Sequence, residues 1–203
     1  MAVGAHVAAH VELARRLSSR SRCYYAARAG VERAIAVVNA DTNGWDAYSE
    51  EWGDQPAVFR EIPCGNGRVW FTVAHATVRG DGSVVTNYGL ADEQARVDLN
   101  EAGVDLLRAL FEEVGGMEAG AAARLAQAIA DFRIPEAEQG GRRTSVFRGN
   151  DLRPGRFDSI YDLLALENVP GDVFERLREC ITVHGGRVNI NTASEPVLMA
   201  VAR

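Results

Sequence analysis

Few residues of this sequence stand at spacings that would support metal binding or redox chemistry. His6 and His10 lie four residues apart and would share one face of a helix, but no third ligand accompanies them. The three cysteines, Cys23, Cys64 and Cys180, form no C-x-x-C pair. The sequence therefore predicts neither a zinc site nor a redox centre. Whether two of the cysteines pair in an exported chain stays open.

Catalytic groups are equally scarce. The chain holds no G-x-S-x-G, P-loop or H-E-x-x-H motif. Asp92 and Glu93 have the chemistry of an acid and a base, but Arg96 follows them closely, and pairing at the surface accounts for all three. We predict that the protein is not an enzyme. An activity that Asp92→Ala abolishes would contradict this.

Composition narrows the class of protein further. The chain has 203 residues, 47% of them hydrophobic and 25% charged, as in an ordinary folded protein of one or two domains. Its formal net charge of −6 makes a general nucleic-acid binder unexpected. No apolar run reaches the ~18 residues of a membrane-spanning helix, and the first ten residues do not form a signal peptide.

The elements that would position any site begin with a long helix. Residues 3–39 lack proline and carry apolar residues at steps of three and four, which predicts one helix of roughly 55 Å. Part of it should project from the body or lie against another partner. Asn43-Gly44 is expected to end it with a left-handed residue. Its arginines suggest either phosphate or acidic-lipid contact or, as we favour, a solvated face: Arg15, Arg16, Arg20, Arg22 and Arg28.

A β region and then a helical region follow. The stretches "AVFREI", "RVWFTVAHATV" and "SVVTNYGL" are separated by glycine-flanked turns at 65–67 and 80–82, which predicts an antiparallel meander. From residue 101 to about 180 the apolar spacing becomes helical, with breakers between the segments. The glycine- and arginine-rich residues 135–156 should form a long exposed loop.

One phrase occurs twice. "RVDLNEAGVDLLRALF" and "RVNINTASEPVLMAVAR" each consist of a short extended segment, an Asn and an apolar helix. We expect Asn100 and Asn191 to cap the following helices, because an Asn side-chain oxygen can accept from unpaired first-turn amides. Thr192 and Glu195 have the spacing of a capping box. The phrases therefore predict two helix starts of one structural type.

Six motifs in this order resemble a known family. They are "YYAARAGVERAIAVVNAD", "WDAYSEEW", "GLADEQARVDLNEA", "AIADFR", "FDSIYDLL" and "ITVHGGRVNINTA". Together they look like the K-type minor pseudopilin of the type II (general) secretion system, and "NINTAS" resembles the opening of a helix-hairpin-helix module. The resemblance implies an α+β fold: a long pilin-like N-terminal helix, an antiparallel β meander and an inserted, mostly α-helical domain.

The resemblance also implies an organisation of the chain. Residues 1–44 would be the long helix, 45–100 the β region of the pilin-like domain, 101–181 the helical insert, and 182–203 the start of a second helical piece. The family's leader and apolar membrane helix, and segments after the second Asn motif, are not among these residues. We therefore expect the sequence to be part of a longer protein.

The implied function is structural. Such proteins sit at the tip of a periplasmic pseudopilus with other minor pseudopilins, on the periplasmic face of the inner membrane. They initiate or cap assembly for protein export across the outer membrane. The inner-membrane contact would come from an N-terminal segment outside this sequence. We expect the long helix to meet neighbouring helices through Tyr24, Ala27, Gly30 and Val31.

Two further possibilities follow from the resemblance. No cofactor is expected to be required, but family members can hold calcium on acidic loops of the insert, for which Asp131, Glu136 and Glu138 are the available ligands. Phe132 stands where the family usually has Trp, and ordinary surface carboxylates are the simpler interpretation. The alternative function is helix-hairpin-helix DNA binding. The candidate hairpin "EEVGGMEAGAA" carries three glutamates and no basic residue, so no nucleic acid is expected.

Overall fold

The computed structural model describes residues 2–78, 83–134, 155–166 and 169–203, with side chains described at all of these except 2–9 and 78. The chain divides into two compact units, residues up to Ala91 and residues from Asp92 onward. Within the described ranges, no helix is both long and apolar enough to cross a bilayer. Helices and short strands occur together, and the predicted α+β class is confirmed.

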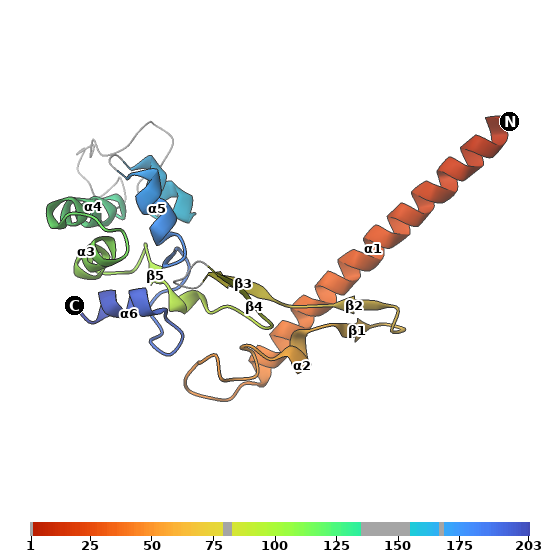
Figure 1. The fold of residues 1–203 in the computed structure, drawn as a ribbon, viewed down its shortest axis with the longest axis horizontal. Coiled ribbons are helices and arrows are strands. Elements are labelled where there is room, and N and C mark those ends of the chain that lie inside the picture. Colours follow the sequence, from red (N-terminus) through yellow and green to blue (C-terminus); the bar gives the residue numbers. More distant parts are fainter. Residues whose placement is uncertain (1, 79–82, 135–154, 167–168) are drawn as a thin grey trace. The chain divides into compact units, whose positions relative to one another are not determined.

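The first unit combines a long helix with two hairpins (Figure 1). Its elements are α1 (Ala2–Ala40), α2 (Pro56–Phe59), β1 (Ile62–Cys64), β2 (Val69–Phe71), β3 (His75–Val78) and β4 (Val84–Asn87). β1 pairs with β2 and β3 with β4, both antiparallel, in separate sheets. The antiparallel pairing is as predicted, but the single meander is not. The chain leaves the ladder after β2, where the Val73 amide donates to the Phe59 carbonyl at 2.9 Å.

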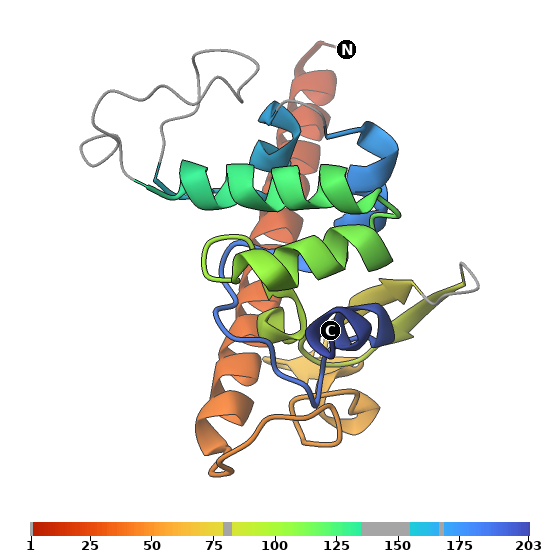
Figure 2. The ribbon, with the colours of Figure 1, turned by 90° about the vertical axis from the view of Figure 1, so that its left-hand side faces the viewer.

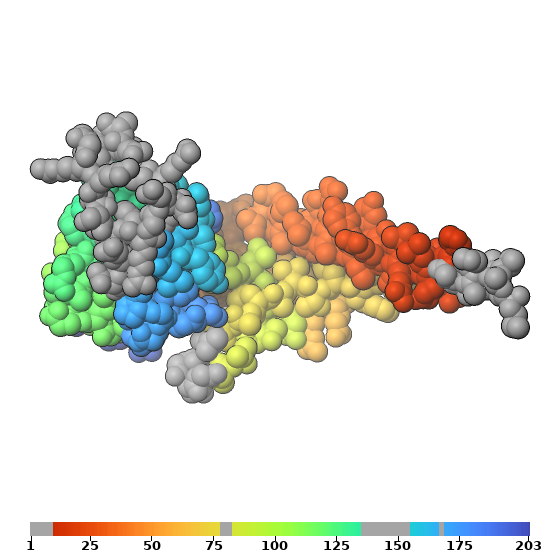
Figure 3. Space-filling model, turned by 90° about the horizontal axis from the view of Figure 1, so that it is seen from above, coloured from red at the N-terminus to blue at the C-terminus, as the bar shows by residue number. Residues whose placement is uncertain are grey.

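Helix α1 buries only part of its length within this unit. Its 39 residues span about 58 Å at the usual rise per residue. Every side chain from residue 10 to residue 25 is exposed, and buried positions begin at Ala26 and continue with Gly30 and Val37. This C-terminal half packs against β2, and Figure 3 shows the orange residues of α1 beside the yellow residues of the hairpin. The long, partly unburied helix was therefore predicted correctly.

Two local predictions for the first unit were wrong. Gly44 does not adopt a left-handed conformation; instead the Asp41 carboxylate accepts from the Asn43 amide at 2.9 Å just after α1 ends. The "AVFREI" stretch was expected to be a strand, yet Pro56–Phe59 forms α2. Proline at the first helical position is pre-set for helix and has no amide to leave unpaired.

The small core of the first unit depends on two glycines. Val37, Trp52 and Phe59 form this core. Beside it, the Leu90 amide donates to the Trp52 carbonyl at 2.9 Å, which brings two backbone segments together. A Cβ at Gly89 would lie 1.5 Å from the Gly53 carbonyl oxygen. Only glycine permits this approach.

The second unit is mostly helical. Its elements are η1 (Glu93–Ala95, a 3-10 turn), β5 (Val97–Asp98), α3 (Val104–Glu113), α4 (Ala119–Phe132), η2 (Ile160–Ala165, a 3-10 helix), α5 (Gly171–Leu177), β6 (Ile181–Thr182) and α6 (Glu195–Val201). Figure 2 shows α4 and α3 side by side. Residues 92–100 and 182–203, which the sequence suggested were separate from the insert, belong to this unit. The residues expected to form a loop at 135–154 lie outside the described ranges.

The core of this unit explains why its helices form. On α4, Leu125, Ile129 and Phe132 recur at steps of four and three and are buried. The Phe132 and Phe157 rings lie 4.4 Å apart between centroids. At one edge β5 and β6 pair in parallel, with Val97 opposite Ile181. This pairing was not predicted, because two-residue strands carry no periodicity.

Candidate functional site

The most prominent surface feature is an apolar stripe along α1. Six large apolar side chains of this helix are 48–62% exposed: Leu13, Leu17, Tyr24, Val31, Ile35 and Val38. At about 100° per residue they fall within an arc of about 60°. We call these six residues the α1 stripe. The buried positions Ala26, Gly30 and Val37 lie on a different side of the helix, so α1 has two apolar faces and packs only one of them in its own unit.

The spacing of the α1 stripe is that of a helix–helix seam. Leu17, Tyr24, Val31 and Val38 recur every seven residues. The second core position of a heptad lies three residues further on, and it holds the small residues Ala27 and Ala34. Heptads of this kind let one helix lie along another, with side chains of each fitting between those of its partner. Small residues at the contact allow a closer approach of the two backbones.

The α1 stripe continues into a groove of the first unit. A hollow of about 650 Å³ lies between α1 and the segment 71–74, and Leu90 also lines it. Ala27, Val31, Ile35 and Val38 line its helical wall. Its remaining walls are formed by Phe71, Thr72, Val73 and Ala74. Side chains of an added helix could therefore enter a recess, as well as lie on an exposed face.

The four predicted interface residues differ in exposure. Tyr24, Ala27 and Val31 are exposed on or beside the α1 stripe. Gly30 is buried, and a Cβ there would lie 3.3 Å from the Phe71 ring. Its small size thus serves the packing of α1 on β2. Sequence reasoning missed Ile35 and Val38, although their apolar character and spacing were visible.

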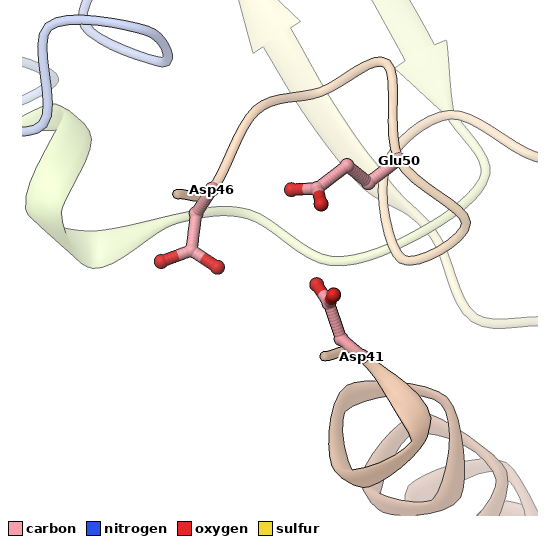
Figure 4. A group of neighbouring side chains, drawn as sticks. All are labelled: Asp41, Asp46 and Glu50. Atoms are coloured by element: carbon pink, nitrogen blue, oxygen red, sulfur yellow. The ribbon is translucent and has the colours of Figure 1, made fainter. Parts of the chain in front are cut away.

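A second feature is a group of carboxylates after α1. Oxygens of Asp41, Asp46 and Glu50 all lie within 4.8 Å of one another, and Figure 4 shows their side chains turned toward a common space. The Asn43 side-chain amide donates to one Glu50 oxygen, and the Ala47 amide donates to the other at 2.8 Å. These bonds, the one from Asn43 foremost, hold the pKa of Glu50 below its ordinary value.

The carboxylate group was not predicted, although its spacing of five and four residues stood in the sequence. Three carboxylates could supply oxygens to a hard cation such as calcium, which takes six to eight. Glu50, however, already has both oxygens hydrogen-bonded within its own loop. The arrangement therefore organises the turn after α1, and we infer no metal site from it.

The predicted calcium ligands are only partly within the described ranges. Asp131 lies near the end of α4 and accepts a 2.8 Å bond from the Gln127 side chain. Glu136 and Glu138 lie outside the residues that the structure describes. Of the three predicted ligands, only Asp131 therefore lies within the described ranges.

The residues Asn100 and Asn191 do not cap helices. α3 begins after Gly103, and α6 begins after Ser194. Asn100 instead donates to the carbonyls of Phe157 and Val183, at 3.1 Å each, and accepts from the Phe157 amide at 2.8 Å. It therefore joins segments 57 and 83 residues away along the chain.

The capping box predicted at Thr192 is also absent. The Thr192 hydroxyl donates instead to the carboxylate of Asp92, at 2.6 Å and 100 residues earlier in the chain. Glu195 is the first residue of α6, and Ser194 precedes it without a side-chain cap. Proline at the second position of α6 removes one of the amides that a cap would satisfy.

The two phrases nevertheless share one structure, built by the residue two places earlier. The Asp98 carboxylate accepts from the Asn100 amide at 2.7 Å, and the Asn189 side chain accepts from the Asn191 amide at 3.1 Å. The carbonyl of each also accepts from the amide four residues on, in Ala102 or in Ala193. Each is an Asx turn, and a helix follows six residues later in both copies. Two helix starts of one type are thereby confirmed.

The groups considered for catalysis are used in structure. Glu93 pairs with Arg96 at 2.9 Å, as the surface interpretation predicted, and accepts from the Thr182 hydroxyl at 2.6 Å. The Asp92 carboxylate accepts from Gln94 and from Asn189. Both carboxylates thus link η1 to the segment 182–192.

The hairpin between α3 and α4 lacks the features of a phosphate-binding loop. The Gly115 carbonyl accepts two bonds from the Arg176 guanidinium, at 2.7 and 3.1 Å. On its flanks, Glu112 and Glu113 pair with Arg203, and the Glu118 side chain caps α4. The glutamates beside the hairpin disfavour contact with the negatively charged backbone of a nucleic acid.

Comparison with known proteins identifies the fold. No protein-family model and no curated protein matches the sequence. The chain is similar to a chain in the crystal structure of the GspK-GspI-GspJ complex from the enterotoxigenic Escherichia coli type 2 secretion system. The TM-score is 0.60 at 16% identity, over 92% of this chain and 68% of that chain. The two chains share a fold, in agreement with the pilin-like α+β class that the sequence resemblance implied.

Proposed function

We propose that this chain is a minor pseudopilin of the K type, acting at the tip of a type II secretion pseudopilus on the periplasmic face of the inner membrane. Its partners would be other minor pseudopilins, as in the complex whose chain it resembles in fold. The α1 stripe is the observation that carries the proposal. A helix with heptad-spaced apolar residues left exposed is built to pack along another helix.

The energetics favour such an association. Large apolar side chains that are about half exposed still have surface to remove from water, at roughly 25 cal/mol per Å². The groove beside Val31 lets part of that surface be covered on more than one side. The residues on the opposite face of α1 already contact the unit's own strand, so the partner has a defined side on which to bind.

The second unit would supply the tip function. The hydrophobic core of this unit contains no residue of α1, and Phe111, Phe132 and Phe157 are buried in it. A body of this size carried by a pilin-like helix would prevent a further subunit from adding beyond it. The chain would thus begin assembly and limit growth in one direction. The proposed role requires no cofactor; if calcium does bind, Asp131, Glu136 and Glu138 are the carboxylates available to hold it.

Recovery of partners from a periplasmic extract, with competitor DNA present, tests the proposal. The wild-type chain should recover other minor pseudopilins, identified by mass spectrometry, whether or not DNA is added. Val31→Ser should lose them, because it places a hydroxyl in the centre of the α1 stripe. Tyr25→Ser is the matched control, since Tyr25 is 65% exposed but lies off the stripe.

Two outcomes would contradict the proposal. Salt-sensitive retention of DNA without any pseudopilin would favour the helix-hairpin-helix alternative. Equal recovery of pseudopilins by wild-type chain and Val31→Ser would show that binding does not use the α1 stripe.

A further inference from the structure

The charges beside the α1 stripe add information about the partner. Arg16 and Arg20 follow one edge of its N-terminal half, and Arg28 lies on the other edge. Arg20 stands in the heptad position that Ala27 and Ala34 occupy further along. It is exposed and makes no ion pair with any residue in the described ranges. Among the residues that the structure describes, Arg16 and Arg28 pair with exposed carboxylates of α1 itself, Glu12 and Glu32.

A helix lying along the α1 stripe would cover the Arg20 side chain. A charge taken from water without a partner is costly, whereas a carboxylate opposite it restores a charge-assisted hydrogen bond. In helical pairs, charged residues at the edges of the seam set the choice of partner in this way. We propose that the helix bound by the α1 stripe carries carboxylates opposite Arg16 and Arg20. This inference rests on the proposed function and specifies the chemistry of its partner.

The same charges disfavour a second copy of this chain. In a parallel pair, Arg20 would face Arg20 of the other copy. In an antiparallel pair centred on the stripe, Arg20 would lie near Val31 and remain without a carboxylate. Either arrangement leaves guanidinium groups unpaired or in repulsion. The α1 stripe therefore selects a different, acidic helix.

A membrane surface fits the stripe less well than a helix does. The arginines would suit anionic headgroups, but the stripe continues into the groove between α1 and residues 71–74. A flat surface does not enter such a recess, whereas side chains of a helix do. The heptad spacing is also particular to helical pairs.

Two synthetic four-heptad helices test this proposal. Both carry Leu at every core position; one has Glu and the other Lys at every edge position, so each repels itself. Affinity for the purified chain is measured by calorimetry at low and at raised salt. We expect the Glu peptide to bind about tenfold more tightly than the Lys peptide, with a smaller preference at raised salt.

Two variants of equal charge locate the effect. Arg16→Gln with Arg20→Gln should remove most of the preference for the Glu peptide. Arg15→Gln with Arg22→Gln changes the net charge equally on another side of α1 and should keep it. Val31→Ser should weaken binding of both peptides.

The outcomes separate the two proposals. Equal affinity for the two peptides, or equal loss of preference in both double variants, would overturn the inference about charge while leaving the helix-docking surface intact. Binding of neither peptide would contradict that surface itself. Self-association of the wild-type chain in sedimentation, or binding to phosphatidylglycerol vesicles in preference to the Glu peptide, would overturn the assignment of an acidic helix as partner.

Discussion

Replacing Asn100 with alanine should destabilise the second unit strongly. The side chain makes three hydrogen bonds to the backbone of Phe157 and Val183, at 2.8–3.1 Å. Their removal leaves two carbonyls and one amide without these partners at a half-buried site. Each such group costs about 1–3 kcal/mol when buried, and water can satisfy part of a half-buried set, so we expect a loss of about 2–4 kcal/mol. That is a large part of the stability of a small domain.

Asn191→Ala is the matched control. Asn191 occupies the equivalent place in the second phrase, but it is exposed, and its side chain makes no comparable link to any residue of the described ranges. Its substitution should change the free energy of unfolding by less than about 0.5 kcal/mol. Urea unfolding followed by far-UV circular dichroism measures both variants, with the same slope expected for each. Equal destabilisation by the two substitutions would refute the assignment of the linking role to Asn100.

Three further perturbations address the first unit and the cysteines. The pKa of Glu50 is lowered in the folded chain. Its stabilising bonds should therefore be present above about pH 4.3 and lost as the pH falls through the lowered value. The resulting acid step in tryptophan fluorescence should disappear in Glu50→Gln, and its persistence in that variant would contradict this assignment. Gly89→Ala should cost more than about 2 kcal/mol in urea unfolding, and Gly44→Ala, which meets nothing within 4 Å, less than about 0.5 kcal/mol. Cys23 is exposed, whereas burial raises the pKa of the Cys180 thiol, so maleimide should label Cys23 at least about tenfold faster. Mass spectrometry of the labelled peptides measures both rates, and faster labelling of Cys180 would contradict this prediction.

Patterns that repeat over many residues predicted the fold well. The long helix was predicted at 3–39 and observed as Ala2–Ala40, because several turns of apolar spacing outweigh any one residue. The glycine turn at 65–67 was predicted correctly, with Gly65 and Gly67 both at positive φ. Single-residue inferences did less well. The stop expected at Gly44 failed because the Asp41 carboxylate organises the chain there instead.

In the candidate site, too, the repeating pattern was predicted better than the roles of single residues. The apolar spacing places Tyr24 and Val31 on one face of a helix, but it does not tell which of the two apolar faces packs inward. Gly30 was predicted to meet a neighbouring helix, and it is buried against the ring of Phe71. The partners of Asn100 lie 57 and 83 residues away, a separation at which local sequence carries no signal. Tertiary contact decides such roles.

Site-specific photocrosslinking along α1 shows whether a partner helix lies on the α1 stripe. A photoreactive phenylalanine analogue is placed at Val31 on the α1 stripe or at Arg15 on another side of the helix, and crosslinks formed in the periplasm are mapped by mass spectrometry. We expect Val31 to crosslink to a helix of another minor pseudopilin and Arg15 not to do so. Crosslinking from both positions alike, or from Arg15 alone, would contradict a partner bound to the stripe.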